Sequence, residues 1–420
     1  MAISAIKGMN DILPGDVETW QFLEQKVREV FGAYGFNEIR TPIVEKTELF
    51  CRSIGEATDI VEKEMYTFAD KSEKNSLTMR PEGTAPVMRS FIQNRLHTLD
   101  PVNKLYYMGP MFRYERPQKG RYRQFHQIGA EVLGVENPMI DAQLLAMLHH
   151  YFCEIGIDSV QLQVNSLGCP ECRPAYRQTL ISYLESRIDT LCGDCQRRYQ
   201  TNPLRVLDCK VPGCKEATRE APSVLDHLCG GCEEHFAAVK KHLSGLEIPF
   251  VINARMVRGL DYYVRTTFEL VTDQLGSQNA VAAGGRYDGL VESLDGPALP
   301  GIGFAIGVER LVLMKGEAKV PAKRPDIFFA TMGDEATEKA FVLMSQLQRA
   351  GISAEMDYQG KSLKSQMRRA NKLAARYSLV LGEQELESGE VELKDMDQSS
   401  QQKVALVGLV SLMGQLCSSA

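Results

Sequence analysis

Apolar residues near the start of the chain recur every three or four positions, which is the period of an amphipathic α-helix. This spacing runs from Trp20 to Tyr34 and stops at Gly35, a residue type that commonly ends helices. It predicts a helix of about 16 residues. The next segment, 36–45 (FNEIRTPIVE), predicts a short strand, and Pro42 within it suits a sheet edge or the first residue of a new strand.

Residues 106–133 predict two strands joined by a loop. Residues two apart on a strand share one face, so Arg113 and Glu115 are expected side by side on the first strand. The flanking residues are apolar, and polar groups set among apolar ones need partners. The connecting loop is strongly basic and carries Arg116, Lys119, Arg121 and Arg123.

The return strand is expected to place Gln127, Gly129 and Glu131 on one face. Because Gly129 has no side chain, another group can lie close to the sheet there. This hairpin suits a ligand that is anionic at one end and carries hydrogen-bond donors at the other. A nucleotide bound beside an amino acid fits that description, and an ordinary solvated strand face is the alternative.

Segment 77–92 (LTMRPEGTAPVMRSFI) predicts a strand, a turn and a helix. Thr84 is expected to cap the helix. Arg80, Glu82 and Thr84 alternate, so all three could face one pocket, although the same residues also suit a plain turn.

Eight of the 11 cysteines form four pairs between Cys169 and Cys232. The composition changes over this stretch, and we expect residues 169–244 to be a mainly helical domain inserted into a larger one. Its own helices are predicted near 176–190 and 233–243.

The cysteine spacing favours metal binding, because two thiolates from one tight turn can hold a tetrahedral ion together. The central spacing, C-x2-C-x13-C-x4-C, resembles a zinc ribbon, and the outer pairs would form a second structural zinc site. Reduced buried thiols are the alternative, whereas disulfides and a redox role are not favoured. His227 or His235 could replace a ligand. The two expected sets are Cys192, Cys195, Cys209 and Cys214, and Cys169, Cys172, Cys229 and Cys232.

Strand patterns resume at 250–271, and 301–314 is typical of a glycine-rich strand that runs into a helix. Residues 317–324 predict a polar linker. Residues 325–420 alternate strands and helices, which indicates a separate α/β domain. A helix expected at 361–376 carries a basic face, with a solvated face as the alternative. That face consists of Lys361, Lys364, Arg368, Lys372 and Arg376.

The 420 residues have room for two or three domains. The net charge of −6 means that any nucleic-acid binding must rely on local basic patches. There is no signal-peptide core and no apolar run near the ~20 residues of a membrane span, which predicts a cytoplasmic protein without membrane partners.

Several of these segments together resemble class II aminoacyl-tRNA synthetases, and histidyl-tRNA synthetases in particular. YGFNEIRTPIVE at 34–45 resembles motif 1, with Pro42 as its signature proline. FRYE at 112–115 with its hairpin resembles motif 2, and GIGFAIGVER at 301–310 resembles motif 3. TMRPEGT at 78–84 and VRGLDYY at 257–263 resemble the two histidine-binding segments of that family. The cysteine-rich insertion departs from the family pattern, because many members carry an insertion with few cysteines.

The resemblance implies an α+β catalytic domain with an antiparallel sheet, a cysteine-rich insertion and a C-terminal α/β domain that binds the anticodon. The expected boundaries are 1–168 and 245–316 for the two parts of the catalytic domain, 169–244 for the insertion, 317–324 for the linker and 325–420 for the anticodon-binding domain.

The resemblance also implies a histidine–tRNA ligase. In that reaction the carboxylate of histidine attacks the α-phosphate of ATP, and the histidyl-adenylate then passes histidine to tRNA(His). ATP with Mg²⁺, tRNA(His) and a second copy of the chain are the implied cofactors and partners. Catalysis of this kind rests on positioning and charge stabilisation rather than on a side-chain nucleophile.

For ATP, the resemblance assigns Arg113 to the α-phosphate, with Arg258 on its opposite side. Glu115 would accept from the adenine amino group. Arg121 and Arg310 would hold the distal phosphates, and Arg310 would also cover the adenine.

For histidine, the resemblance assigns Glu82, Thr84 and Gln127 to the amino group. Glu131 and Tyr263 would read the imidazole, because the ring offers one donor and one acceptor. The complete implied set is Glu82, Gly83, Thr84, Gln127, Glu131, Tyr262 and Tyr263.

Three other functions are weighed against this one. A regulatory subunit of histidine biosynthesis on the same fold would lack the C-terminal domain and part of the arginine set. A prolyl or threonyl synthetase would not be expected to carry the segment RGLDYY. A zinc-dependent nucleic-acid-binding module would explain the cysteines but not the hairpin.

Overall fold

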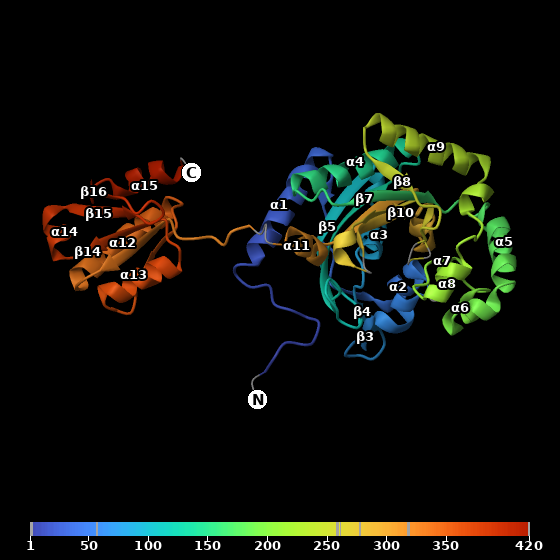
Figure 1. Cartoon of the computed structure of the whole chain (residues 1–420), viewed down its shortest axis with the longest axis horizontal. Coiled ribbons are helices and arrows are strands. Elements are labelled where there is room, and N and C mark those ends of the chain that lie inside the picture. Colours follow the sequence, from blue (N-terminus) through green and yellow to red (C-terminus); the bar gives the residue numbers. More distant parts are fainter. Residues whose placement is uncertain are drawn as a thin grey trace. The chain divides into compact units, whose positions relative to one another are not determined.

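The chain divides into two units, Met1–Val320 and Pro321–Ala420, and each has its own sheet and core (Figure 1). No helix among the residues that the structure describes is long and apolar enough to cross a membrane. This computed structural model describes residues 3–55, 58–257, 260, 262–276, 279–316 and 320–418.

An eight-stranded sheet forms the centre of the first unit. Its strands are β1 (Asn37–Glu38), β5 (Asn103–Phe112), β6 (Gln124–Leu133), β7 (Gln161–Ser166), β8 (Phe250–Ile252), β9 (Val264–Val271), β10 (Ala280–Arg286) and β11 (Gly301–Gly307). They lie in the order β1-β5-β6-β11-β10-β9-β7-β8. Neighbours from β5 to β7 are antiparallel, and the two outermost pairs are parallel. The sheet is therefore mixed, and the expected antiparallel arrangement holds for its interior.

Three helices cover one face of this sheet: α1 (Val17–Ala33), α4 (Pro138–Glu154) and α9 (Gly230–Gly245) (Figure 1). Helix α4 packs against both α1 and α9. The apolar spacing that predicted the first helix matches α1, and Gly35 follows its end with a φ of 81°. The period of the sequence thus identified the buried stripe of α1 correctly.

Alternation along β6 separates this core from the polar face of the sheet. Ile128 and Val132 are buried in the core beneath the helices. Their neighbours Gln127 and Glu131 have to point to the opposite face, because successive strand residues alternate. The polar face of β6 is therefore the face that carries the candidate site.

A smaller sheet leads into the turn that carries Glu82 and Thr84. Its strands β2 (Val44–Lys46), β4 (Ser76–Met79) and β3 (Tyr66–Ala69) pair in this order, and both pairings are antiparallel. Helix α2 (Thr47–Ile54) follows β2, and α3 (Thr84–Gln93) follows β4. Shorter elements are α10 (Leu290–Ser293), α11 (Val308–Lys315), η1 (Ile60–Glu64), η2 (Leu96–Thr98), η3 (Ile188–Thr190), η4 (Val224–His227) and η5 (Asp273–Leu275).

Between β7 and β8 the chain forms a helical insertion with a small apolar core of its own. Its helices before α9 are α5 (Arg173–Glu185), α6 (Gly193–Arg198), α7 (Leu204–Leu207) and α8 (Pro212–Ala217). Helix α9 then returns the chain to the main sheet. The boundaries 169–244 for this insertion stay a prediction.

The second unit contains a five-stranded sheet in the order β13-β12-β14-β15-β16. The expected β-α-β-α-β pattern accounts for its three parallel strands, and the antiparallel pair that follows was not predicted. Its elements are β12 (Ile327–Thr331), α12 (Asp334–Arg349), β13 (Ala354–Met356), α13 (Leu363–Lys372), β14 (Tyr377–Leu381), α14 (Glu383–Ser388), β15 (Glu390–Asp395), β16 (Gln401–Ala405) and α15 (Leu409–Ser418).

Candidate active site

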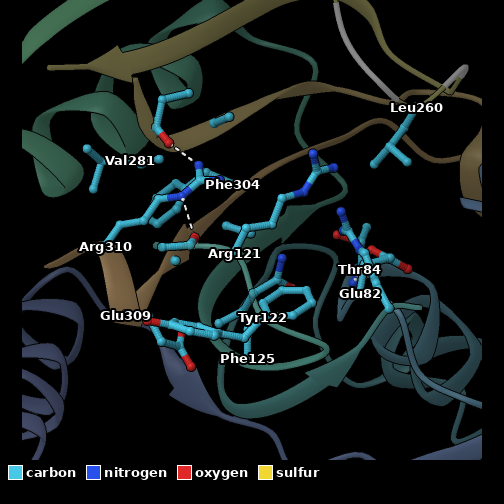
Figure 2. A pocket seen from close by; sticks show the side chains of 18 of the residues that line it. Glu82, Thr84, Arg121, Tyr122, Phe125, Leu260, Val281, Phe304, Glu309 and Arg310 are labelled. Atoms are coloured by element: carbon cyan, nitrogen blue, oxygen red, sulfur yellow. Dashed lines mark hydrogen bonds between the residues drawn. The ribbon is translucent and has the colours of Figure 1, made fainter. Parts of the chain in front are cut away.

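A cavity of ≈ 360 Å³ lies on the polar face of the main sheet. In the view of Figure 2, Arg310 lies on one side, Glu82 and Thr84 lie on the other, and Arg121 lies between them. The cavity thus joins a basic end to an end with carboxylate and hydroxyl groups. Among the sequence-predicted residues, it is lined by Glu82, Thr84, Arg113, Glu115, Arg121, Gln127, Tyr262, Tyr263 and Arg310.

Arg113 and Glu115 were predicted to lie on the first strand of the hairpin, and this prediction is wrong because both follow the end of β5. The ladder ends at Phe112. Just beyond it, the backbone N–H of Tyr114 donates to the carbonyl of Glu64, 2.6 Å away, on a different segment of the chain. The two charged side chains therefore belong to the basic loop between β5 and β6.

Contacts on two sides hold Arg113 at the cavity wall. Its Nε donates to the carbonyl of Pro81 at 2.9 Å, and its guanidinium lies 5.2 Å from the centre of the Phe125 ring. Glu115 is buried, and it forms an ion pair with Arg121. The carboxylate of Glu115 has further acceptor positions for a ligand, and Arg121 has further N–H donors for a phosphate, so both can bind while the ion pair stays in place.

Three cations converge at the basic end of the cavity. Arg310 lies in the first turn of helix α11 and is oriented by hydrogen bonds to the carbonyls of Ala280 and Gly120, the second at 3.4 Å. Burial lowers the pKa of Arg310, and the nearby charges of Arg121 and Arg113 lower it further. Such a concentration of positive charge favours a bound anion such as a phosphate chain.

Glu82, rather than Thr84, caps helix α3. Its carboxylate accepts from the backbone N–H groups of Thr84 and Ala85, both at 2.8 Å. Thr84 is already the first residue of the helix, and Gly83 precedes it at the N-cap. A carboxylate at this end of a helix is favoured by the exposed N–H groups and by the helix dipole. Burial raises the pKa of Glu82 in spite of these bonds.

Arg80 does not face the cavity that Glu82 and Thr84 line, which is a second correction. Its guanidinium donates to the carbonyl of Pro110 at 2.9 Å and to the carbonyl of Thr41 at 2.9 Å. Arg80 therefore ties the small sheet to the end of β5. Alternation alone could not reveal this, because the turn at Pro81 breaks the strand period.

Glu131 does not itself line the cavity, but it bonds to Thr84, which does. It is fully buried, and its two carboxylate oxygens accept from the hydroxyls of Thr84, at 2.7 Å, and Tyr287. Burial raises the pKa of Glu131 to about 8, although these two hydrogen bonds lower it. Gly303 on β11 faces Glu131, and any side chain there would collide with the carboxylate. Tyr287 was not predicted, because segment 284–290 (GGRYDGL) shows no catalytic or binding pattern beyond its glycines.

The space above Gly129 is filled by Tyr107, a residue of the neighbouring strand. A Cβ at Gly129 or at Gly83 would collide with the Tyr107 ring. The missing side chain at Gly129 predicted the close approach of another group, and the group that approaches is the buried ring of Tyr107. Tyr107 thereby joins β5, β6 and the start of α3 in one packed layer.

Gln127 offers an unused acceptor to the cavity. Its Oε1 is buried and has no hydrogen-bond partner among the residues that the structure describes. Tyr262 and Tyr263 line the same cavity, and their ring centres are 4.6 Å apart. An orphan amide oxygen beside Glu82 suits an ammonium or amino group, because a buried acceptor without a donor is costly.

Arg258, expected opposite the α-phosphate, lies outside the described residues. The same holds for Gly259 and Asp261 in the same segment.

The comparisons with known proteins cover nearly the whole chain. Residues 8–311 match the model of the histidyl-tRNA synthetase family, and residues 326–416 match an anticodon binding domain. The chain belongs to the histidyl-tRNA synthetase family. It is 72% identical to the histidine–tRNA ligase of Syntrophotalea carbinolica, over 97% of each chain, and 65% identical to that of Geobacter metallireducens, over 96% of this chain and 97% of the relative.

A crystal structure of the apo histidyl-tRNA synthetase of S. aureus shares this fold. Its TM-score is 0.83 at 38% identity, and the match covers 98% of this chain and 100% of the other. The sequence-based family assignment and the expected three-part architecture are thus confirmed.

The eight cysteines of this synthetase gather in two groups, in the nested pairing expected from their spacing. One group contains Cys169, Cys172, Cys229 and Cys232, and the other contains Cys192, Cys195, Cys209 and Cys214. All eight are free thiols. Neither histidine considered as a substitute ligand belongs to these groups. The Nε2 atom of His235 lies 3.6 Å from Oδ2 of Asp141, and the ring of His227 packs against that of Tyr176.

The basic face expected in the second unit is shorter than predicted. Helix α13 carries Lys364, Arg368 and Lys372, which are exposed and four residues apart. Lys361 precedes the helix and Arg376 follows it, so neither extends the helical face. The helix ends at Lys372, and Ala374 just beyond it has a φ of 52°, which is incompatible with a continuing helix.

Proposed function

We propose that this member of the histidyl-tRNA synthetase family catalyses two successive steps. Histidine and ATP give histidyl-adenylate and pyrophosphate, and histidine is then transferred to tRNA(His). One observation carries the proposal: a single cavity joins three converging arginines to a wall that holds the orphan amide oxygen of Gln127 and the side chains of Glu82 and Thr84. The basic end suits the phosphates of ATP, and the other end suits an amino acid with a ring donor.

In the first step an oxygen of the histidine carboxylate bonds to the α-phosphorus of ATP, and the bond to the bridging oxygen of pyrophosphate breaks. Arg113 would contact the α-phosphate from one side and Arg258 from the other. Arg121 and Arg310 would hold the departing phosphates, with Arg310 also over the adenine and Glu115 at its amino group. Mg²⁺ would enter with ATP and neutralise part of the phosphate charge. Fixed cations at developing charge are a large source of catalysis.

Histidine would be held by its two ends. Glu82, Thr84 and Gln127 would bind the amino group, and this role is supported by the unused acceptor on Gln127. Glu131 and Tyr263 would read the imidazole, with Tyr262 beside them. A carboxylate has about four acceptor positions, so Glu131 can accept a ring N–H in addition to its two hydroxyl partners.

The second unit would hold the anticodon of tRNA(His). This role is supported by the match to an anticodon binding domain and by the exposed cations Lys364, Arg368 and Lys372. Cations at this spacing can contact successive phosphates. A regulatory relative without ligase activity is disfavoured, because this chain has the second unit and keeps Arg113 and Arg310 at the cavity.

We also propose a cytoplasmic homodimer and a structural zinc role for the eight cysteines. The dimer is supported by the apolar residues Ile43 and Val44, which are 42% and 40% exposed beside Pro42. Sedimentation of the full chain tests this assembly.

The deciding experiment is ATP–pyrophosphate exchange with each of the twenty amino acids in turn. Exchange should depend on histidine alone, and charging of tRNA(His) should follow at the same enzyme concentration. Exchange driven by another amino acid, or none at all, would refute the proposal.

A further inference from the structure

The inner cysteine group has the geometry of a four-thiolate metal site. The sulfurs of Cys192, Cys195, Cys209 and Cys214 all lie within 4.8 Å of one another, and those of Cys192 and Cys209 are 3.9 Å apart. Zinc–sulfur bonds of about 2.3 Å in a tetrahedron place the sulfurs ~3.8 Å apart. A disulfide would need about 2.05 Å. The spacing therefore fits one ion between four thiolates.

The outer group repeats this geometry at the base of the insertion. The sulfur of Cys169 lies 3.6 Å from that of Cys172 and 3.8 Å from that of Cys229. Each group also receives a backbone hydrogen bond at one sulfur: the N–H of Cys229 donates to the Cys172 sulfur, and the N–H of Cys192 donates to the Cys214 sulfur, both at 3.1 Å. Donors to the sulfurs stabilise thiolate charge in a metal site.

We infer that each chain holds two structural zinc ions and that these ions brace the two ends of the segment 255–263. The bracing part rests on the proposed function, because it concerns the histidine-binding residues that this segment carries. Four thiolates in a tetrahedron suit zinc or a single iron. The short mutual distances leave no room for a cluster of several irons.

The outer group connects to the far end of that segment. Arg173 directly follows Cys172, and its guanidinium donates to the carbonyl of Tyr263. The strand entering the insertion also pairs with the chain just after Tyr263, since the N–H of Arg265 donates to the carbonyl of Gly168 at 2.9 Å. Gly168 has a φ of 66° and lies against Cys172. The turn that carries Cys169 and Cys172 is therefore connected directly to the chain at Tyr263.

The inner group connects to the near end of the segment. Helix α8 carries Cys214, whose carbonyl accepts from the Thr218 hydroxyl at 2.9 Å. Arg255 donates to the carbonyl of Thr218 at 2.6 Å and to its hydroxyl at 2.8 Å. The insertion therefore contacts both ends of the segment 255–263: Thr218 accepts from Arg255 at its start, and Arg173 donates to the carbonyl of Tyr263 at its end.

A second cavity, of ≈ 230 Å³, lies where the insertion adjoins the candidate site. Leu260 and Tyr263 line both this cavity and the larger one. Its other side is formed by Tyr176 and Val224 from the core of the insertion. Displacement of the insertion core would therefore change the position of Tyr263, the residue proposed to bind histidine.

The first test counts the ions. Full-length protein purified without chelator should contain two zinc ions per chain by elemental analysis. The pairs Cys169→Ser with Cys172→Ser, and Cys192→Ser with Cys195→Ser, should each retain one. Cys153→Ser is the matched control, because Cys153 is exposed and lies outside both groups, and it should retain two.

Cobalt provides a readout that does not need the variants to fold. Wild-type protein grown with Co²⁺ should show the intense sulfur-to-metal absorption of tetrahedral thiolate sites, at two equivalents. Wild-type protein with less than one metal ion per chain and eight freely reacting thiols would overturn the inference.

The second test separates bracing from metal binding. Arg173→Ala and Arg255→Ala should keep two zinc ions and raise the KM for histidine in exchange about tenfold, while the KM for ATP stays within twofold. Arg173→Lys should recover part of the loss. The control is Gln178→Ala on the exposed side of α5, outside the cavity, with little expected change. Unchanged histidine KM in both variants would refute the bracing, whereas a wild type without histidine-dependent exchange would refute the proposed function instead.

Discussion

The hydroxyl of Tyr287 donates a hydrogen bond to Oε2 of Glu131, a residue 156 positions away in the sequence. Thr84 occupies the other oxygen from a third segment, at 2.7 Å. Because all three groups are buried, each depends on the others for a partner. The carboxyl group that we assign to imidazole recognition is thus set by two hydroxyls before any substrate arrives.

Replacing Glu131 by alanine should weaken histidine binding far more than ATP binding. Above the pKa of Glu131, where the carboxylate is ionised, a hydrogen bond to it contributes about 1.5–3 kcal/mol, so the affinity for histidine measured there should fall roughly 10- to 150-fold. Tyr287→Phe is the matched variant, because it removes one partner of Glu131 and should give a smaller loss of the same kind. Calorimetry with each substrate measures both effects. Equal losses for histidine and ATP would show that Glu131 is only structural.

The raised pKa of Glu131 predicts a specific pH dependence of stability. Its carboxyl group has a pKa of about 8 when folded and buried, against 4.5 ordinarily. Between these values the folded state binds the extra proton, so this group's contribution to stability is complete below pH 4.5 and is lost as the pH rises towards 8. Glutamine cannot titrate, so Glu131→Gln should gain stability relative to the wild type as the pH rises through this range. The free energy of unfolding of the variant, relative to that of the wild type, should rise by up to about 1.4 kcal/mol per pH unit.

Urea unfolding at pH 5, 6.5 and 8 measures that gain. The buried carboxyl of Asp141, whose pKa is also raised, is present in both proteins and cancels in the comparison. A difference between Glu131→Gln and wild type that stays constant with pH would contradict the assignment.

Arg258→Ala should abolish adenylate formation and leave the protein folded. Loss of one fixed charge at a developing transition state costs on the order of 3–4 kcal/mol, or a few hundredfold in rate. Arg349→Ala at the end of α12, in the second unit, serves as the control and should leave exchange unchanged. Histidine-dependent exchange within a few-fold of the parent would show that the role given to Arg258 is wrong.

Ending the chain at Val320 should separate the two half-reactions. This cut follows the division between the two units, and the residues assigned to adenylation all lie before it. The truncated protein should retain part of its exchange activity and charge tRNA poorly. In the full chain, replacing Lys364, Arg368 and Lys372 by alanine should reproduce the charging defect without any loss of exchange. Undiminished tRNA affinity in both proteins would count against the anticodon role.

Where sequence reasoning went wrong, the cause was a contact between distant segments. Strand β5 ends before Arg113: the N–H of Arg113 still donates to the carbonyl of Arg123, but the next N–H, of Tyr114, donates to the carbonyl of Glu64. Thr84 is not a cap, because Glu82 takes the free N–H groups and the Thr84 hydroxyl turns to Glu131. Arg80 is drawn away to the carbonyls of Thr41 and Pro110.

The sequence by itself determined what depends on local period and spacing. The alternation of Gln127, Gly129 and Glu131 on β6, the buried stripe of α1 and the nested cysteine pairs were all readable, because neighbours along the chain set them. The motifs were specific enough to identify the family.

Only the tertiary structure decided which distant groups become partners. Tyr287 reaches Glu131, Tyr107 fills the space above Gly129, and Arg173 reaches the carbonyl of Tyr263. None of these contacts has a local signal, because each joins segments that meet only when the sheet assembles. Buried polar groups must then find partners among whatever the fold brings near, and that choice is made by packing in three dimensions.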